Sequence, residues 1–343
     1  MTAREMIKRR FAHQPTGSYT PYDVLFEEDL HRKLCEHYGG DAWQRDLLRK
    51  FTCNHLQVDT IGMHPVDERY AKDAWGALWR MDRKPWSLDK PPADEPSFDA
   101  FELPDPSVFV APILRDKAAA IAKYRANDEQ YRLIDMGWGI FEHSWRVLGF
   151  EEALMAMITD EDFYYELVQK IADIYVEMVK ALSDVPADGI LFGDDWGEQR
   201  GVIMGPERWR RFIKPCWARV YDEVHRQGKV AIQHSCGSIC DIYDDLAQIG
   251  MDVHESVQPE AQGMAPERIK SRWGGKISFW GCLGNQGILH RGTPGEIRDE
   301  ILRLRDLFLA DGGYVLAPAK PLPDEMPIES AVAVIETLAR LND

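Results

Sequence analysis

The chain has 343 residues and a formal net charge of −16, from 57 acidic and 41 basic side chains. This length can bury a large core, either as one barrel-sized domain or as two smaller ones. The acidic balance argues against nucleic acid and anionic membrane surfaces as partners, because both need a basic face. No apolar run approaches the ~20 residues of a membrane span, and "MTAREMIKRRFAHQPTG" lacks the apolar core of a secretory signal. Six cysteines without a disulfide-like framework predict reduced thiols and a cytoplasmic location.

The N-terminal part, residues 1–110, is irregular, with proline, glycine and aromatic residues scattered through it. Within it, "SYTPYDVLF" (18–26) and "FTCNHLQVDTIG" (51–62) are the segments expected to supply the first strands. Residues 90–107, rich in proline and acidic side chains, predict a long surface loop.

From residue 111 to residue 343 the pattern becomes regular, with strands and helices in alternation. Helices are predicted over 111–126, 160–183, 205–228, 239–250, 265–275, 293–313 and 328–341. Strands are predicted over 131–141, 187–197, 229–238, 251–259, 276–287 and 314–323. Such alternation with short connections implies parallel strands joined by helical crossovers. Together with the two early segments it predicts an α/β protein, a (β/α)8 TIM-type barrel, as one domain over 1–343. A doubly wound sheet is the alternative, but neither GxGxxG nor a Walker loop follows any strand.

Unusual polar and aromatic residues fall where these strands end. In a TIM barrel the chemistry sits at the carboxyl ends of the strands, so residues far apart in sequence would meet in one mouth. The residues at these positions are Trp138, Glu142, His143, Asp194, Asp195, Trp196, Glu198, His234, Cys236, His254, Glu255, Trp280, Cys282 and Lys320.

His234 and Cys236 are the strongest metal-ligand candidates. An i, i+2 spacing on an extended segment turns both side chains to the same side, and Zn²⁺ binds both imidazole and thiolate. A catalytic zinc needs three protein ligands, so Cys282 or Glu255 from the next strand ends would complete the site. The alternative is a packed cysteine beside a hydrogen-bonded histidine.

Acidic residues and a lysine are the candidate catalytic groups. Consecutive Asp194 and Asp195 point to opposite faces of an extended strand, so at most one of them faces the mouth. That residue, or Glu142, would hydrogen-bond an N–H-rich or cationic ligand or act as an acid or base. A helix cap or a salt bridge to Arg200 is the structural alternative. Lys320, in a loop stiffened by prolines, would bind a substrate carboxylate or simply lie on the surface.

Substrate contacts are assigned to aromatic residues and a histidine at the same strand ends. The expected pocket residues are Trp138, His143, Trp196 and Trp280.

With these residues assembled, the chain resembles the uroporphyrinogen decarboxylase superfamily, most closely its corrinoid-dependent methyltransferases of the methylcobalamin:coenzyme M type. The segments that carry the resemblance are "KDAWGALWR" (72–80), "DDWGEQRGVIMGPERWRRFIKP" (194–215), 228–261, "ISFWGCLGNQGIL" (277–289) and 312–327. The resemblance implies a TIM-type barrel, often a homodimer. The arginine-rich substrate motif of true uroporphyrinogen decarboxylases is missing from "SYTPYDVLFEEDL", which removes the charge pairing that a porphyrinogen needs.

In the methyltransferases that the chain resembles, zinc holds a thiol substrate through His, Cys and a second Cys in the last strand's loop. His234 and Cys236 match the first two, but Lys320 stands in place of the second Cys. The change puts thiol activation in doubt and allows an O-methyl or N-methyl compound as methyl donor, with zinc as Lewis acid.

Any cobalamin is expected on a separate corrinoid protein or free, because "DVHESV" (252–257) lacks the glycine of the corrinoid-binding D-x-H-x-x-G element. Three hypotheses follow: a corrinoid-dependent methyltransferase first, a metal-independent decarboxylase second, and a non-catalytic tetrapyrrole or corrinoid binder third.

Overall fold

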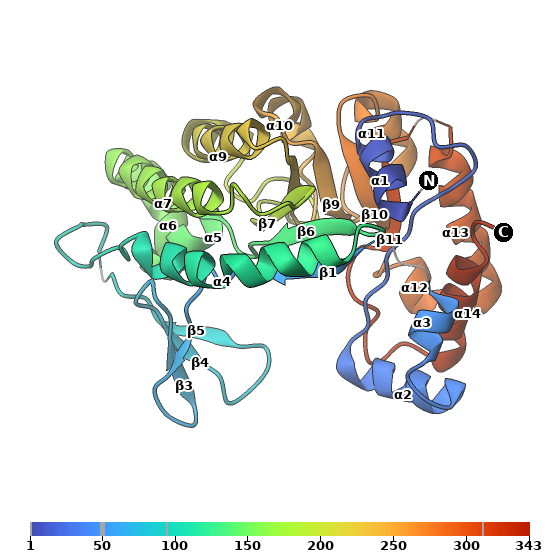
Figure 1. The fold of residues 1–343 in the computed structure, drawn as a ribbon. Helices are drawn as coiled ribbons and strands as arrows, with labels where there is room; N and C mark the ends of the chain where they lie inside the picture. Colours follow the sequence, from blue (N-terminus) through green and yellow to red (C-terminus); the bar gives the residue numbers. More distant parts are fainter. Residues whose placement is uncertain (1, 49–51, 94, 311) are drawn as a thin grey trace.

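A curled, seven-stranded parallel sheet forms the centre of the protein (Figure 1). The computed structural model describes residues 2–48, 52–93, 95–310 and 312–343. The strand order is β1-β6-β7-β8-β9-β10-β11, so the strands follow chain order, as in βα-repeat folds. The strands are β1 (Thr52–Gln57), β6 (Tyr131–Asp135), β7 (Gly189–Gly193), β8 (Val230–His234), β9 (Val253–Val257), β10 (Ser278–Leu283) and β11 (Tyr314–Pro318).

Helices connect these strands along the outside of the sheet (Figure 1). They bury apolar residues in the core that they share with the sheet. The principal helices are α4 (Ser107–Ala126), α5 (Ile140–Leu148), α6 (Phe150–Thr159), α7 (Glu161–Ala181), α9 (Lys214–Arg226), α10 (Tyr243–Ile249), α11 (Pro266–Trp273), α13 (Pro294–Phe308) and α14 (Ile328–Ala339). The short helices are α8 (Pro206–Arg208), α12 (Ile288–Arg291) and a 3₁₀ turn at Cys240–Ile242. None of the helices in the described part of the chain is long and apolar enough to cross a membrane.

The prediction of an eight-stranded barrel is confirmed only in part. Segment 18–26, predicted as a strand, contributes only two isolated parallel bridges in the described structure, Tyr22–Leu316 and Phe26–Leu322. It therefore runs beside β11 as an eighth chain segment without forming a full ladder. The result is a TIM-like α/β fold with seven strands in its described sheet.

The helix predicted over 205–228 is interrupted. Its middle, Trp209–Ile213, is a π-helical turn between α8 and α9. Pro215, the second residue of α9, has no N–H to continue the regular i→i−4 ladder, which favours such a local widening.

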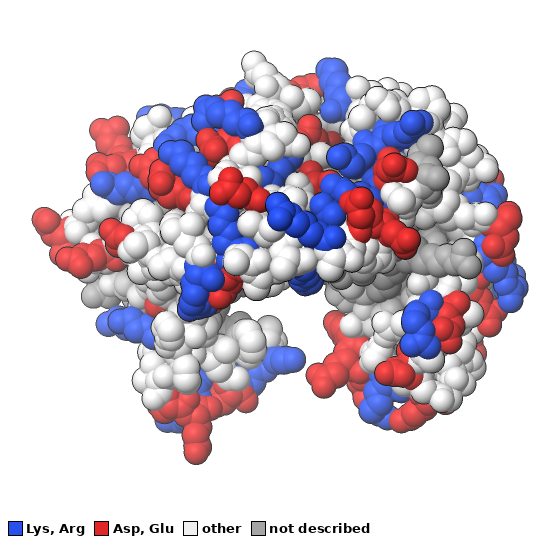
Figure 2. Space-filling view, viewed as in Figure 1, with Lys and Arg blue, Asp and Glu red and all other residues white. Residues whose placement is uncertain are grey.

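Two insertions that the sequence analysis did not resolve lie in the N-terminal part. One is α2 (Glu28–Tyr38) with α3 (Trp43–Leu47), which follows segment 18–26. The other is a four-stranded antiparallel sheet after β1, made of β2 (His64–Pro65), β3 (Tyr70–Lys72), β4 (Leu78–Arg80) and β5 (Ser87–Lys90). The two insertions stand as separate lobes with a notch between them, and charges of both signs mix over this face (Figure 2).

The N-terminal helix α1 (Ala3–Phe11) packs onto the interior of the curled sheet. Ile7 and Phe11 belong to the inner apolar cluster that contains Tyr131 and Trp280. Arg4 fixes the helix through two hydrogen bonds to Asp188, at 2.8 and 2.9 Å.

We expect Asp188→Ala to lower the free energy of unfolding by about 2 kcal/mol, because it removes a charge-assisted pair whose carboxylate is only 3% exposed. Urea unfolding followed by tryptophan fluorescence measures the change. Asp128→Ala is the matched control: this carboxylate also pairs with Arg4 but is 76% exposed, so its loss should cost under about 1 kcal/mol. Equal losses in the two variants would contradict this account of α1.

Candidate active site

A cavity of about 540 Å³ opens at the carboxyl ends of the strands. This is the end at which TIM-type folds place their chemistry. Its lining mixes apolar surface with five carboxyl groups, two imidazoles and one lysine. The lining residues are Asp23, Val24, Leu25, His55, Asp135, Gly137, Trp138, Glu142, Leu191, Gly193, Asp195, His234, Glu255, Trp280, Ala317, Pro318, Ala319, Lys320 and Pro321.

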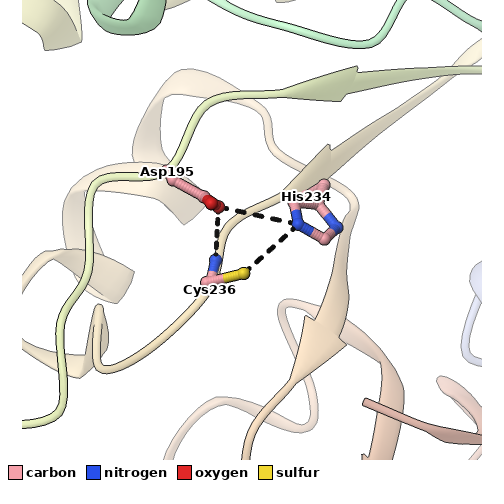
Figure 3. A group of neighbouring side chains, drawn as sticks. All are labelled: Asp195, His234 and Cys236. Carbon is pink, nitrogen blue, oxygen red and sulfur yellow. Dashed lines mark hydrogen bonds and ion pairs between the residues drawn. The ribbon is translucent and has the colours of Figure 1, made fainter. Parts of the chain in front are cut away.

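Asp195, His234 and Cys236 form a cluster at this end of the sheet (Figure 3). One ligand atom from each, a carboxylate oxygen, an imidazole nitrogen and the thiol sulfur, lies within 4.8 Å of the other two. The Cys236 sulfur is 3.5 Å from Nε2 of His234, and that nitrogen is 3.6 Å from Oδ1 of Asp195. The described residues thus bring together the two ligands predicted from the sequence and a third, Asp195, predicted only as a catalytic group.

The loop after β8 is held so that Cys236 faces Asp195. The backbone N–H of Cys236 donates to Oδ1 of Asp195 at 2.8 Å. Gly197 makes this close packing possible, because a Cβ there would stand 2.4 Å from the carbonyl oxygen of Cys236. The glycine of "DDWGE" is therefore a packing requirement of the site.

Glu255 lies behind the imidazole rather than in the ligand cluster. Its Oε2 forms a hydrogen bond with Nδ1 of His234. Burial lowers the pKa of His234, but Glu255 opposes it, and the net pKa is well above the usual value. Glu255, expected as a ligand, is thus positioned to orient the ring and leave Nε2 toward Asp195 and Cys236.

Lys320 stands at the edge of the same cluster. Burial lowers its pKa, while Cys236, Asp195 and Glu255 raise it, and the net shift is upward. Its backbone is held by Asn285, whose Oδ1 accepts from Lys320 N at 3.0 Å. The loop thus presents a charged ammonium group to the thiol.

Asp194 is buried beside the cavity and does not line it. Its carboxylate accepts four hydrogen bonds, from the backbone N–H groups of Phe141 and Glu142 and from the indoles of Trp196 and Trp217, at 2.7–3.1 Å. It therefore caps α5 and ties that helix to the loop after β7. A helix cap was the structural alternative to a catalytic role for Asp194, and Asp194 occupies that position.

Glu142, in the first turn of α5, faces the cavity. Burial raises its pKa to about 8, and the carboxyl groups of Asp194 and Asp195 act in the same direction. Its Oε2 accepts from the backbone N–H of Gly139 at 3.2 Å.

Trp138 forms one wall of the cavity, with a buried cation behind it. The guanidinium carbon of Arg146 lies 3.8 Å from the Trp138 ring centroid and 4.9 Å from that of Trp79 in β4. Arg146 also pairs with Asp73 at 3.3 Å. The antiparallel sheet thus supports the pocket wall.

Among the residues expected in the mouth, Asp194 and His254 are buried, and three with an assigned substrate or metal role also lie elsewhere. Trp196 is fully buried and packs edge-on against Trp209. His143 is also fully buried, stacked on Trp75 with ring centroids 4.0 Å apart.

Cys282 is the third, and its backbone explains its position. Strand alternation predicts that it shares a face with Trp280, which does line the cavity. A register shift between Trp280 and Gly281 and a φ of 69° at Cys282 break the alternation. Cys282 consequently lies in the core between sheet and helices, near Arg303 and Glu267, with a pKa raised by burial.

Several cavity residues were missed from the sequence. Asp135 ends β6, so the strand-end argument could have found it; burial raises its pKa. His55 lies in β1, and Asp23 in segment 18–26, whose irregular composition gave no such signal.

Parallel strands whose carboxyl ends hold carboxylates, an imidazole and a thiol around one cavity define a TIM-like protein with the features of an enzyme. The chain belongs to the uroporphyrinogen decarboxylase family, whose model matches residues 78–341. The resemblance inferred from the sequence is thereby confirmed. No curated protein matches the sequence.

A solved structure shares this fold over the whole length of the chain. A methyltransferase from Methanosarcina mazei matches with a TM-score of 0.68 and 16% identity, over 100% of this chain and 98% of that one. A B12-independent methionine synthase from Shewanella sp. W3-18-1 matches with a TM-score of 0.40 and 14% identity, over 81% of this chain and 75% of that one.

Proposed function

We propose that the protein is a methyltransferase of a corrinoid-dependent system. It moves a methyl group between a small O-, N- or S-methyl compound, or a thiol, and a cobalamin, with the assistance of zinc. The observation that carries the proposal is the cluster of Asp195, His234 and Cys236 at the cavity. The full-length match to a structure named as a methyltransferase supports it.

The three side chains fit a divalent zinc ion. Carboxylate oxygen, imidazole nitrogen and thiolate sulfur are all zinc ligands, and three of them leave a fourth position open. Asp195 would supply the ligand missing where Lys320 replaces the second cysteine. A zinc ion bound there supplies Lewis-acid chemistry toward the atom that gives or receives the methyl group.

The remaining cavity residues position the substrate. Trp138 and Trp280 provide apolar surface for its body, as expected from their strand-end positions. Glu255 holds the His234 ring through Nδ1. Lys320 keeps a positive charge beside Cys236.

The cobalamin would be supplied from outside the barrel, on a corrinoid protein or free. The open mouth, flanked by the insertion α2–α3 and the sheet β2–β5, is where such a partner would approach. A homodimer and a cytoplasmic location remain expectations from the sequence and the family.

The metal-independent decarboxylase fits the cavity less well. A substrate with many carboxylates needs several cations, yet the described lining contains one lysine, no arginine and five carboxyl groups. The resulting field repels polyanions.

The test of the proposed function is methyl transfer to cob(I)alamin. Zinc-loaded protein is incubated with cob(I)alamin and a panel of O-, N- and S-methyl compounds, and the absorbance spectrum is followed. We expect methylcobalamin to form with at least one compound. A protein that leaves cob(I)alamin unchanged with the whole panel, and releases CO₂ from a carboxylic acid substrate instead, would support the decarboxylase.

Removing the group that orients the imidazole should weaken metal binding. We expect Glu255→Ala to lower the zinc affinity by about 10- to 100-fold, the usual effect of losing a partner of a ligating histidine. Competition with a chromophoric chelator measures this affinity. Glu207→Ala, at an exposed glutamate of α8, is the control. An affinity unchanged in Glu255→Ala would show that Glu255 does not act through His234.

A further inference from the structure

We propose that Arg146 is a specificity-determining residue of the cavity at the strand ends, although it does not itself line that cavity. It holds the indole of Trp138 in place, and its charge makes the wall that Trp138 forms unfavourable for organic cations. The inference goes beyond the proposed function, because it concerns which ligands the cavity accepts and not which group is transferred.

Arg146 is a buried cation with little polar compensation. Its side chain is 1% exposed, and among the ion pairs of the described structure it pairs with a single carboxylate, Asp73, at 3.3 Å. Its Nε atom is buried and has no hydrogen-bond partner in that structure. A guanidinium carries five N–H donors, and a buried arginine with a purely structural role is expected to satisfy them with acceptors. The other close partners of Arg146 are aromatic rings instead.

The Trp138 indole is covered on one face by this cation and is flanked by two other indoles. The guanidinium carbon of Arg146 lies 3.8 Å from the Trp138 ring centroid, well inside the ~6 Å range of cation–π contacts. Trp79 and Trp145 make T-shaped contacts with the same ring, at centroid distances of 6.2 and 5.8 Å. The backbone carbonyl of Trp138 accepts a hydrogen bond from the hydroxyl of Tyr175. The part of the indole that these contacts leave free borders the cavity.

The β2–β5 sheet supplies the residues that keep Arg146 against Trp138. Asp73, directly after β3, accepts from Nη1 of Arg146 at 3.3 Å and from the indole N–H of Trp79 at 2.7 Å. Trp79, in β4, also lies against the guanidinium, whose carbon is 4.9 Å from its ring centroid. Two indoles and one carboxylate therefore fix the guanidinium. These contacts give the inserted sheet a role in the cavity wall.

The charge of Arg146 determines how Trp138 interacts with a ligand. The face of an indole attracts cations, and tryptophan is the aromatic side chain that binds them best. Here the guanidinium already uses this attraction, and it repels a second positive charge on the cavity side of the ring. Asp73 offsets this charge only in part, because its carboxylate also accepts from the N–H groups of Ala77 and Trp79.

The cavity therefore treats cations differently at Trp138 than elsewhere. The five carboxyl groups of its described lining attract organic cations. Arg146 opposes this attraction at one wall, where uncharged apolar groups are favoured instead.

Two probes of equal shape measure this preference. Choline carries a trimethylammonium group, and 3,3-dimethylbutan-1-ol carries an uncharged tert-butyl group of the same shape. We expect the double variant Asp73→Asn/Arg146→Met, which removes the charge pair, to bind choline more tightly relative to the alcohol than the wild type does. The expected change in this affinity ratio is about 10-fold, the size of one cation–π contact. Fluorine NMR of fluorotryptophan-labelled protein follows both titrations.

The matched control is Arg115→Met/Asp116→Asn, which removes an arginine–aspartate pair of α4 whose side chains are 72% and 61% exposed. It should leave the affinity ratio unchanged. If the Asp73→Asn/Arg146→Met variant has the wild-type ratio, or binds neither probe, the inference is overturned. Equal changes in the two double variants would overturn it as well.

A measurement on the wild type keeps the inference testable if the Asp73→Asn/Arg146→Met variant does not fold. In crystals soaked with each probe, we expect the tert-butyl group of the alcohol against Trp138. The trimethylammonium group of choline should lie away from Trp138, toward the carboxyl groups. A trimethylammonium group in contact with the Trp138 ring contradicts the inference, as does an alcohol that binds elsewhere or not at all.

Arg146→Lys separates the position of the indole from the charge. Lysine keeps a cation for Asp73 but has no planar group to lie on the two indoles. We expect the affinity ratio to stay close to that of the wild type, while the fluorine resonance of Trp138, assigned by its loss in Trp138→Phe, shifts and broadens. An unchanged resonance would show that Arg146 does not position Trp138. None of these measurements requires methyl transfer, so they decide the inference even if the proposed function fails.

Discussion

Cys236→Ala is expected to abolish stoichiometric zinc binding and to reduce methyl transfer by at least about 100-fold. Loss of a residue that merely supports a ligand typically costs 10- to 100-fold, so loss of a ligand itself should cost at least as much. Two groups of the cluster, Asp195 and His234, would remain, too few for a catalytic zinc. Metal content after dialysis, by mass spectrometry, and the cob(I)alamin assay measure the two effects.

The control is Cys35→Ala, at a half-buried cysteine of α2. This variant should keep both zinc and activity. The comparison separates the loss of a metal ligand from the loss of any cysteine. Full zinc occupancy and full activity in Cys236→Ala would remove the thiol from the site and favour the metal-independent alternative.

Asp194→Ala is expected to lower the free energy of unfolding by about 4 kcal/mol or more. The substitution leaves two buried indole N–H groups and two buried backbone N–H groups without their acceptor, and each such group costs about 1–3 kcal/mol. It also removes the acceptor that caps α5. The variant should therefore show a large fall in urea midpoint, together with a changed tryptophan emission from Trp196 and Trp217.

Asp184→Ala is the matched control for this loss. Its carboxylate is 77% exposed and pairs only with Lys117 among the ion pairs of the described structure, so the change should be under about 1 kcal/mol. A stability loss in Asp194→Ala no larger than in Asp184→Ala would mean that water satisfies the indoles and that Asp194 does not organise the site.

Much of the fold could be predicted from periodicity. The six strands expected after residue 130 all form, because a buried parallel strand leaves a short apolar run between helical patterns. The β2–β5 sheet could not be predicted in the same way. Its strands have two to four residues, too few for a period to appear, and its position depends on long-range contacts such as Arg146 with Trp79.

The site, like the fold, could be predicted where a local sequence pattern decides the position of a residue, but not where tertiary structure decides it. The strand-end rule placed His234, Glu142, Trp138, Trp280 and Lys320 correctly around one cavity. It failed where backbone geometry departs from alternation, as at Cys282, whose positive φ no sequence pattern indicated. It predicted that at most one of Asp194 and Asp195 faces the mouth but left open which one; in the fold four donors enclose Asp194, and Asp195 lies beside His234.

The most direct test of the central claim is a crystal structure of zinc-loaded protein with anomalous data on both sides of the zinc edge. We predict one anomalous peak at the carboxyl ends of the strands, within ligand distance of Asp195, His234 and Cys236, with Glu255 on the far side of the imidazole. A peak at Cys282, or no peak at these three residues in protein shown to contain zinc, would contradict the account.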